Sequence, residues 1–495
     1  MLEKYKYEAV IGLEVHSQLL TKSKMFCSCP SDYLKAAPNT VVCPVCLAMP
    51  GVLPVINRQA VEYVIMTGLA LNSKIAETTQ FHRKNYPYPD LMKGYQISQY
   101  DIPIALGGSL NIDINGKRKT IGITRVHLEE DVAKLHHHKV ANGENYSLID
   151  VNRSGIALME TVSEPEMHSA DEARKYLTEL RSILQYLGVS TGNMEDGSFR
   201  CDANISIRPI NSKALNTKVE IKNLNSLHSV YRALEFEETR QIMLIEDGAT
   251  IIQETRGWDE EKEITFTQRT KENANDYRYI PEPDLPPIQI GKNWIEQINL
   301  LLPELPTEKR NRLTKQYGLT IYDAALLTTS KCTADFFEES LKETHEQSKE
   351  YSTKAKTSAN WILGDLAALL KESAIELDAS YVTPRNFGAF IEMIESGTIN
   401  GPAAKTIFGE MFNSGKEPHA IASDHNLTQI NDVDLLGAAI EKVLKSNSPA
   451  IKDFAAGKAS ASQFLVGQVM KETRGRANPS LVNKILLDKL SSGDY

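Results

Sequence analysis

Apolar and polar residues alternate along several stretches before residue 290, and this alternation constrains the fold more than any other feature of the sequence. In AVIGLEVHSQL, Ile11, Leu13 and Val15 fall on one face of an extended strand, whereas Glu14 and His16 fall on the other. The segments RCDANISIR and KVEIKN repeat this pattern. Such strands are typical of an antiparallel sheet that buries one face and leaves the other open.

Helical patterns lie between and after these strands. In SADEARKYLTELRSILQYLGV, Ser169 or Asp171 can cap a helix, leucines form an apolar stripe and Gly188 ends it. The proline-rich segment YIPEPDLPPIQIGK marks a boundary, beyond which the pattern is helical, and NSGKEPH marks a weaker one. We therefore predict an α+β protein with a sheet-based domain over residues 1–292, an all-helical domain over 293–412 and a small helical tail domain over 413–495.

The chain has the composition of an ordinary globular protein. Of its 495 residues, 41% are hydrophobic and 24% are charged, which leaves ample surface to bury. The N-terminal segment MLEKYKYEAV has no apolar signal core, and no run approaches the roughly 18 apolar residues that cross a bilayer. We expect a cytoplasmic protein that does not enter a membrane, in which thiols stay reduced.

Four of the six cysteines lie in the short segment MFCSCPSDYLKAAPNTVVCPVCL. Cys27 and Cys29 are separated by one residue, and Cys43 and Cys46 by two. Two close pairs joined by a loop can surround one tetrahedral Zn²⁺, and four thiolates leave no open position for catalysis. The alternative is a set of four merely reduced or buried thiols. The spacing favours a structural zinc site.

Charged residues on the polar strand face are the candidates for chemistry, beginning with Glu14 and His16. The segments RVHLEED and LIDVNRSGIALMETVSEPE add further members of this set: Arg125, His127, Glu129, Glu130, Asp131, Asp150, Asn152, Arg153, Glu160, Glu164 and Glu166. Carboxylates together with a histidine suit a divalent cation. The cation most often bound by such a group is Mg²⁺, which bridges phosphate oxygens. A solvated sheet face is the alternative for each residue alone, but the recurrence of charge on several alternating strands favours a site.

Cations and aromatic residues recur in the same part of the chain. Six cations would neutralise phosphate charge in a metal site: Arg83, Lys84, Arg153, Arg200, Arg208 and Lys222. Of these, we expect Lys84, Arg200 and Arg208 to bind the nucleotide. The aromatic segments RKNYPYPD and GYQISQY are equally consistent with a base-stacking wall and with ordinary packing and turns. The chain lacks the P-loop and H-E-x-x-H motifs, which disfavours the enzyme classes that use them.

The net charge of −9 does not indicate nucleic-acid binding by the whole surface, but the C-terminal end differs. Its last 44 residues carry seven Lys and Arg against four Asp and Glu. This excess suits contact with a phosphate backbone, with a soluble helix face as the alternative. The residues that we expect to contact RNA are Lys471, Arg474 and Arg476.

Taken together, these motifs closely resemble the B subunits of tRNA-dependent amidotransferases. The resemblance rests on IGLEVHSQL, KMFCSCP with CPVCLAMPGVLPV, RKNYPYPD, KGYQISQY, ITRVHLEED, DVNRSGIALMETVSEP, DGSFRCDANISI, EIKNLNS, DYRYIPEPDLP and ANPSLVN. These motifs run from one end of the chain to the other, and several are long and irregular. Departures such as Thr161 and Ile280 leave the expected metal ligands in place.

The resemblance implies a glutamine-hydrolysing, ATP-dependent ligase. The family phosphorylates the side-chain carboxylate of misacylated Glu-tRNA(Gln) or Asp-tRNA(Asn), and ammonia then displaces the phosphate. An amidase, which is the A subunit of the complex, supplies the ammonia through a tunnel, and a small C subunit completes the heterotrimer. The catalytic domain is expected to be similar to glutamine synthetase and guanidino kinases, and the tail domain is expected to contact the outer corner of tRNA.

The resemblance also implies roles for individual residues. It matches the Mg²⁺ ligands to His16, Glu130 and Glu160, with Glu14 beside them, and we expect Arg153 to join this catalytic group. The four cysteines match a zinc site that some members of the family carry. Simple alternation conflicts with Glu130, because it places Glu129 on the face of His127, so that a strand end or bulge between them would be required.

Two other functions remain open at this point. A tRNA-binding scaffold without chemistry would be expected to lose one of the proposed metal ligands, yet His16, Glu130 and Glu160 are all present. A ligase that acts on a free small acid would need no tail domain.

Overall fold

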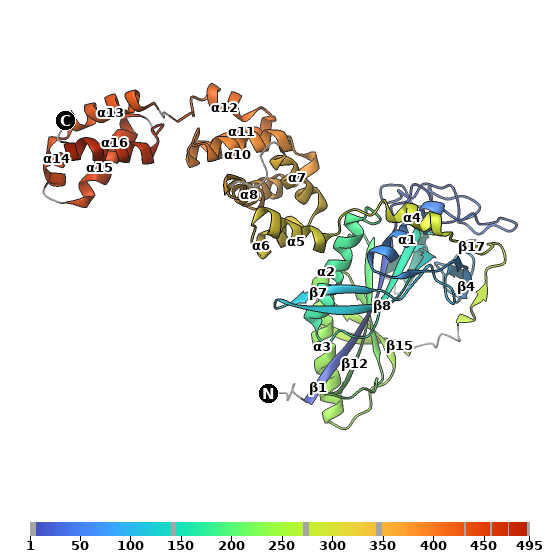
Figure 1. The fold of residues 1–495 in the computed structure, drawn as a ribbon. Helices are drawn as coiled ribbons and strands as arrows, with labels where there is room; N and C mark the ends of the chain where they lie inside the picture. Colours follow the sequence, from blue (N-terminus) through green and yellow to red (C-terminus); the bar gives the residue numbers. More distant parts are fainter. Residues whose placement is uncertain are drawn as a thin grey trace. The chain divides into compact units, whose positions relative to one another are not determined.

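The computed structural model describes residues 6–139, 145–270, 277–342, 349–429, 432–455, 458–473 and 475–492. The chain divides into two compact units, Met1–Pro306 and Thr307–Tyr495 (Figure 1). The described strands all belong to the first unit, whereas the described part of the second is helical, which confirms the predicted α+β class. The three-part division at residues 292 and 412 stays a prediction. Within the described residues, no helix is long and apolar enough to cross a membrane.

The first unit is built on a large twisted sheet. Its path runs β15-β14-β13-β12-β1-β11-β8-β5-β4-β16, and along the described path only β13 and β14 run parallel. The strands are β1 (Tyr7–Gln18), β2 (Lys74–Ile75), β3 (Thr78–Thr79), β4 (His82–Asn85), β5 (Tyr95–Ser98), β6 (Ala105–Leu106), β7 (Ser109–Ile114), β8 (Lys117–Glu130), β9 (Lys134–Lys139), β10 (Asn145–Asp150), β11 (Ala157–Ser163), β12 (Phe199–Pro209), β13 (Val219–Leu224), β14 (Glu254–Asp259), β15 (Ile264–Thr270), β16 (Ile280–Pro281) and β17 (Ile288–Gln289).

Helices cover the apolar face of this sheet. Ile11, Leu13 and Val15 on β1 are at most 1% exposed and share one hydrophobic core with residues of these helices. In Figure 1, α2 and α3 run along one side of the sheet, close to β7 and β12. The helices of the unit are α1 (Arg58–Ala70), α2 (Ala170–Tyr186), α3 (Leu227–Glu246) and α4 (Lys292–Asn299). The other face of the sheet therefore stays available for polar side chains.

The helix α2 forms where the sequence predicts it. The Ser169 side chain accepts a hydrogen bond from the backbone N–H of Glu172, and acidic residues occupy the first turn, which favours the positive end of the helix dipole. Leu177, Leu180 and Leu184 are fully buried against the sheet. Gly188 then adopts a φ of +67°, which glycine tolerates without steric cost, and ends the helical segment.

The second unit contains two separate hydrophobic clusters among its described residues. One extends from Leu313 to Ala422 and the other from Leu436 to Leu490. A five-residue π-helical segment, Ile362–Leu366, interrupts the helical run between α8 and α9. The α-helices are α5 (Pro306–Tyr317), α6 (Ile321–Leu327), α7 (Lys331–Leu341), α8 (Lys349–Trp361), α9 (Ala367–Ser373), α10 (Pro384–Glu395), α11 (Gly401–Ser414), α12 (Pro418–Asp424), α13 (Val433–Ser446), α14 (Ser448–Ala455), α15 (Ala459–Glu472) and α16 (Pro479–Ser492).

Candidate functional site

The open face of the sheet presents a row of polar side chains that crosses four neighbouring strands. His16 on β1 pairs with Arg200 on β12 and with Glu160 on β11, and Glu160 pairs with His127 on β8. Residues directly opposite each other on neighbouring strands point to the same face, so these four side chains lie side by side. The row brings together residues that are far apart in the sequence.

The centre of this row is a compact cluster of metal-ligating groups. The Nε2 atom of His16 lies 3.2 Å from a carboxylate oxygen of Glu129 and 3.5 Å from one of Glu160. One ligand atom from each of these three residues lies within 4.8 Å of the others. Nε2 of His127 is 3.3 Å from Glu160 and supports that carboxylate from the next strand. Two carboxylates and an imidazole at this spacing fit a divalent cation such as Mg²⁺.

The charges of the cluster support one another. Burial opposes a charged imidazole, but hydrogen bonds with Glu129 and Glu160 raise the pKa of His16 to about 10. Burial also opposes ionisation of the two carboxyls, yet the neighbouring histidines hold the pKa of Glu129 and of Glu160 below its ordinary value. The site thus holds two buried carboxylates ready for a positive charge, which the His16 proton supplies when no metal ion is bound.

Glu14 lies two residues before His16 on β1 and has a different environment. The side-chain amide of Asn204 donates a 2.9 Å hydrogen bond to it. Burial, followed by repulsion from Glu160 and Asp202, raises the pKa of Glu14. Glu14 is therefore the carboxyl in this group that protonates most readily, which suits proton transfer better than metal ligation.

Glu130 does not join the cluster. The β8–β11 pairing continues without interruption from Val126 to Glu130, so the bulge that would have turned Glu130 toward His16 is not there. Glu130 instead forms a 2.6 Å ion pair with Lys93 and accepts a 2.9 Å hydrogen bond from the backbone N–H of Ile97. Because side chains alternate along β8, Glu129 lies on the open face and Glu130 does not. The geometry therefore favours Glu129 over Glu130 as the metal ligand that joins His16 and Glu160.

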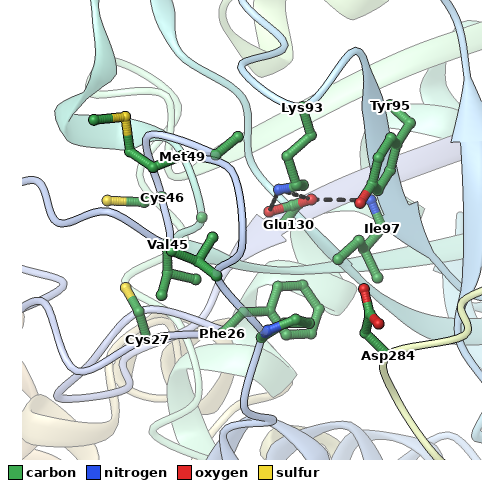
Figure 2. A pocket seen from close by; sticks show the side chains of 14 residues that line it. Phe26, Cys27, Val45, Cys46, Met49, Lys93, Tyr95, Ile97, Glu130 and Asp284 are labelled. Carbon is green, nitrogen blue, oxygen red and sulfur yellow. Dashed lines mark hydrogen bonds and ion pairs between the residues drawn. The ribbon is translucent and has the colours of Figure 1, made fainter.

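Figure 2 shows the surroundings of Glu130. Its carboxylate points toward Lys93 in a hollow of about 160 Å³ whose opposite wall carries Cys27, Cys46 and Met49 from the cysteine-rich segment. Asp284 lines the same hollow. The hollow thus lies between the end of β8 and the cysteine-rich segment.

The expected phosphate-binding cations occupy different places. Lys84 lines the hollow over the metal-ligating cluster, and Arg200 lies in the polar row, where it forms a 2.9 Å ion pair with Asp131. Arg208 lies on the same strand as Arg200 but eight residues further along, about 26 Å away at ~3.3 Å per residue, and pairs with Glu8. Arg208 is therefore placed too far from the cluster to share a ligand with it.

Arg153 supports the site from beneath rather than lining it. Its guanidinium donates hydrogen bonds to the backbone carbonyls of Val132 and Ala133, at 2.8 and 2.9 Å, and lies 3.6 Å from Asp131. Asp131 in turn accepts hydrogen bonds from Gln18 and Arg200. Arg153 thus orients the turn after β8 and, through Asp131, the position of Arg200.

The expected ligands and nucleotide-binding residues did not include several side chains that the structure brings to the open face. A hollow of about 270 Å³ over the cluster is also lined by Arg125, His127, Lys222 and Tyr279. The side chain of Arg125 has no hydrogen bond or ion pair within the described part of the chain, and its Nε atom is buried without a partner. Arg125, His127 and Glu129 were already candidates on the polar strand face, but only Glu130 of this segment was expected to be a ligand. The alternation of RVHLEED places Arg125, His127 and Glu129 on one face and was the signal that favoured Glu129.

The four cysteines form a second cluster, in the irregular segment between β1 and α1. Their Sγ atoms all lie within 4.8 Å of one another, and Cys43 and Cys46 are 3.9 Å apart. A hydrogen bond from the Cys27 thiol lowers the pKa of Cys46, which favours the thiolate form that binds a metal ion. The predicted gathering of all four thiols is confirmed, and the arrangement fits a tetrahedral Zn²⁺.

Two of the expected RNA-binding residues, Lys471 and Arg476, lie at the end of α15 and shortly after it. Lys471 is exposed in the last turn of α15, and Arg476 is half-buried. Arg474 lies outside the described residues. The role of these residues in RNA binding stays a prediction.

Comparison with known proteins gives consistent matches along the chain. A family model described as the GatB/GatE catalytic domain matches residues 9–296, and one described as the GatB domain matches residues 335–490. The chain is 52% identical to the B subunit of the aspartyl/glutamyl-tRNA(Asn/Gln) amidotransferase of Dehalococcoides mccartyi strain CBDB1, over 99% of this chain and 100% of the relative. It is 50% identical to the B subunits of the same enzyme from Carboxydothermus hydrogenoformans and Thermomicrobium roseum, in each case over 98% of this chain and 99% of the relative.

Proposed function

The chain belongs to the family of aspartyl/glutamyl-tRNA amidotransferase B subunits, and we propose that its open sheet face carries out the ATP-dependent amidation of misacylated tRNA. The side-chain carboxylate of Glu-tRNA(Gln) or Asp-tRNA(Asn) attacks the γ-phosphate of ATP, which yields an acyl phosphate and ADP. Ammonia then attacks the acyl carbon, phosphate leaves, and the amide of Gln-tRNA(Gln) or Asn-tRNA(Asn) is formed. Activation is needed because hydroxide is a poor leaving group.

The observation that carries this proposal is the cluster of His16, Glu129 and Glu160 beneath cations that line the same hollow. These three residues would hold Mg²⁺, which would supply positive charge that offsets the negative charge of the phosphates. Lys84 and Arg125 lie over the cluster, where they would orient the transferred phosphoryl group and offset its developing charge. This arrangement supports phosphoryl transfer rather than a scaffold without chemistry.

Other residues of the site position the reacting groups. Arg200, fixed by Asp131, would bind the phosphates from the β12 side of the hollow. Glu14 would accept a proton as ammonia attacks the acyl carbon, because its buried carboxyl lies beside the cluster and binds protons readily. Arg153 keeps Asp131 in place. The four cysteines would hold a structural Zn²⁺ that fixes the segment between β1 and α1.

The proposal includes the partners of the reaction. The chain would work in a heterotrimer in which the A subunit, an amidase, releases ammonia from glutamine and a small C subunit completes the assembly. Lys471 and Arg476, with Arg474 beyond the described residues, would contact the phosphate backbone of tRNA. A cytoplasmic location stays a prediction.

The experiment that tests this function is amidation by the purified complex of this chain with its amidase and its small partner. Ammonium replaces glutamine, and Glu-tRNA(Gln) and Asp-tRNA(Asn) are supplied separately with and without Mg-ATP. We expect amide to form only with ATP. The tRNA that is amidated at the higher rate is then the preferred substrate. Amide formed from free glutamate or aspartate would instead indicate a small-acid ligase. A complex that binds both tRNAs but amidates neither would contradict the proposal and favour a scaffold.

A further inference from the structure

A lysine is buried next to the four thiols of the cysteine-rich segment. Lys24 is 0% exposed and is one of the largest fully buried side chains in the described part of the chain. Its Nζ atom donates a 2.9 Å hydrogen bond to the backbone carbonyl of Val41. Within the described residues, it forms no ion pair with a carboxylate. Because lysine is almost never fully buried unless it is paired, this side chain requires an anion nearby.

The position of Lys24 directs its charge to the thiol cluster. Its backbone N–H donates a 2.9 Å hydrogen bond to the carbonyl of Cys29. A Cβ atom placed on Gly155 would lie 3.7 Å from the Cβ of Cys46 and 3.7 Å from the Cδ of Lys24, so both side chains pack against the same point of the backbone. A hydrogen bond from Cys27 and, more weakly, the positive charge of Lys24 lower the pKa of Cys46.

The thiol cluster can supply the anion that Lys24 lacks. Four thiolates carry four negative charges and Zn²⁺ neutralises two of them, so an occupied site would have a net charge of −2. When four thiols bind the metal, four protons leave and one Zn²⁺ enters, so that the charge of the cluster falls by two. A buried positive charge beside the sulfurs favours this change, because water and salt screen the attraction only weakly there.

A purely structural role is the alternative, since the hydrogen bond of Lys24 also holds the loop between the two cysteine pairs. That loop is already held by Asn152, whose side-chain oxygen accepts a 2.8 Å hydrogen bond from the N–H of Val41. The amide group of Asn152 also donates a 2.7 Å hydrogen bond to the carbonyl of Ala37. A neutral side chain could donate to the carbonyl of Val41 equally well. The loop therefore does not require the charge of Lys24.

We propose that Lys24 is the counter-charge of the zinc site formed by Cys27, Cys29, Cys43 and Cys46, and that it increases the affinity of this site for the metal. The inference rests on the zinc site proposed above and is independent of the amidation chemistry. Lys24 does not bind the metal. It is a positioning residue that acts through the sulfurs, and zinc in turn compensates the cost of burying its charge.

The test measures zinc binding by the full-length chain. Lys24→Met removes the charge and keeps an unbranched apolar side chain, whereas Lys24→Gln keeps a hydrogen-bond donor without the charge. Lys22→Met, at an exposed lysine of the same segment, is the control. The dissociation constant for Zn²⁺ is determined by competition with a chelator of known affinity. We expect both Lys24 variants to bind zinc about 10- to 100-fold more weakly, as is typical when a partner of the metal ligands is removed, and Lys22→Met to bind it normally.

The Tm, measured with excess zinc and with excess EDTA, separates a charge effect from a packing effect. We expect zinc to raise the Tm of Lys24→Met by less than it raises that of the wild type. Without zinc, the variant should melt no lower than the wild type, because it no longer buries an incompletely paired charge. Loss of a packing contact would instead lower the Tm equally in both conditions.

Equal zinc affinity in the wild type and Lys24→Met, or wild-type affinity in Lys24→Gln, would overturn the inference and leave Lys24 with a structural role alone. A wild-type chain that binds no zinc would overturn the zinc site itself, and the role of Lys24 with it.

Discussion

The two candidate metal clusters of the first unit differ in how the chain assembles them. The four thiols come from one segment between residues 27 and 46, so the chain needs only a local loop to bring them together. His16, Glu129 and Glu160 come from three strands and meet only because β1, β11 and β8 pair in one register. Four sulfur ligands would fill the coordination of a metal ion and leave no position for a substrate. The cluster of His16, Glu129 and Glu160 offers oxygen and nitrogen ligands beneath an open hollow.

Because they are built differently, the two clusters should fail in different ways. Loss of a thiol should loosen a segment and lower stability while the sheet face keeps its groups. Loss of a carboxylate on the sheet face should stop the chemistry and leave the fold intact, because the sheet is held by its register and by the core behind it.

Glu129→Gln should produce the largest effect. We expect amidation with ammonium to fall by about a hundredfold or more, because one carboxylate of the metal-ligating cluster is neutralised. Glu130→Gln is the matched control, since Glu130 is the next residue of the same strand and points to the opposite face. A larger loss of kcat in Glu130→Gln than in Glu129→Gln would show that the assignment of the ligand to Glu129 is wrong.

Cys43→Ser should mainly change stability. The purified wild-type chain should carry about one zinc per chain, and the variant should lose most of it. We expect the Tm of the first unit to fall by roughly 5 °C, because binding of the metal to the folded state no longer stabilises it. Cys332→Ser, at an exposed cysteine of the second unit, serves as the control and should change neither property. A wild-type chain that is free of zinc would refute the structural zinc site.

Arg125→Ala should have an intermediate effect on the open face. The Arg125 side chain has no hydrogen bond or ion pair within the described residues, so its removal leaves no buried partner behind and should not alter the Tm. We expect kcat for amidation to fall about tenfold, because a charged donor to the phosphoryl group is lost. Arg118→Ala, at an exposed arginine of the same strand, should leave kcat unchanged. Equal rates in both variants would remove Arg125 from the site.

Ser169→Ala should have the smallest effect on stability and on activity. It changes only the helix-covered face of the sheet and leaves the open face as it is. The variant removes the hydrogen bond that caps α2, which costs about 1 kcal/mol and should lower the Tm by roughly 2 °C. Ser169→Thr keeps a capping hydroxyl and should recover most of this loss. Amidation at a temperature well below the Tm should not change; a fall in kcat would show that the two faces of the sheet are coupled.

Much of the fold follows from local signals in the sequence. The alternation around Ile11 and Leu13 predicted the strand and its buried face, and Ser169 with Gly188 predicted the bounds of α2 to within about a residue. The cysteine spacing predicted the thiol cluster. Each of these signals acts over a few residues, where backbone geometry and capping chemistry determine the outcome without help from distant parts of the chain.

The composition of the open site depended on how the strands pair. Arg200 and Arg208 fall on the same polar side of the alternating segment RCDANISIR. Only Arg200 enters the polar row, because the pairing of β12 with β1 places Arg208 beside Glu8. Glu129 and Glu130 are chemically equivalent in the sequence, and the uninterrupted β8–β11 register decides which one meets His16. Alternation along one segment is enough to tell which of its residues share a face. Which strands become neighbours is settled only in the folded sheet, because register is a property of two segments and is fixed by the core that both bury.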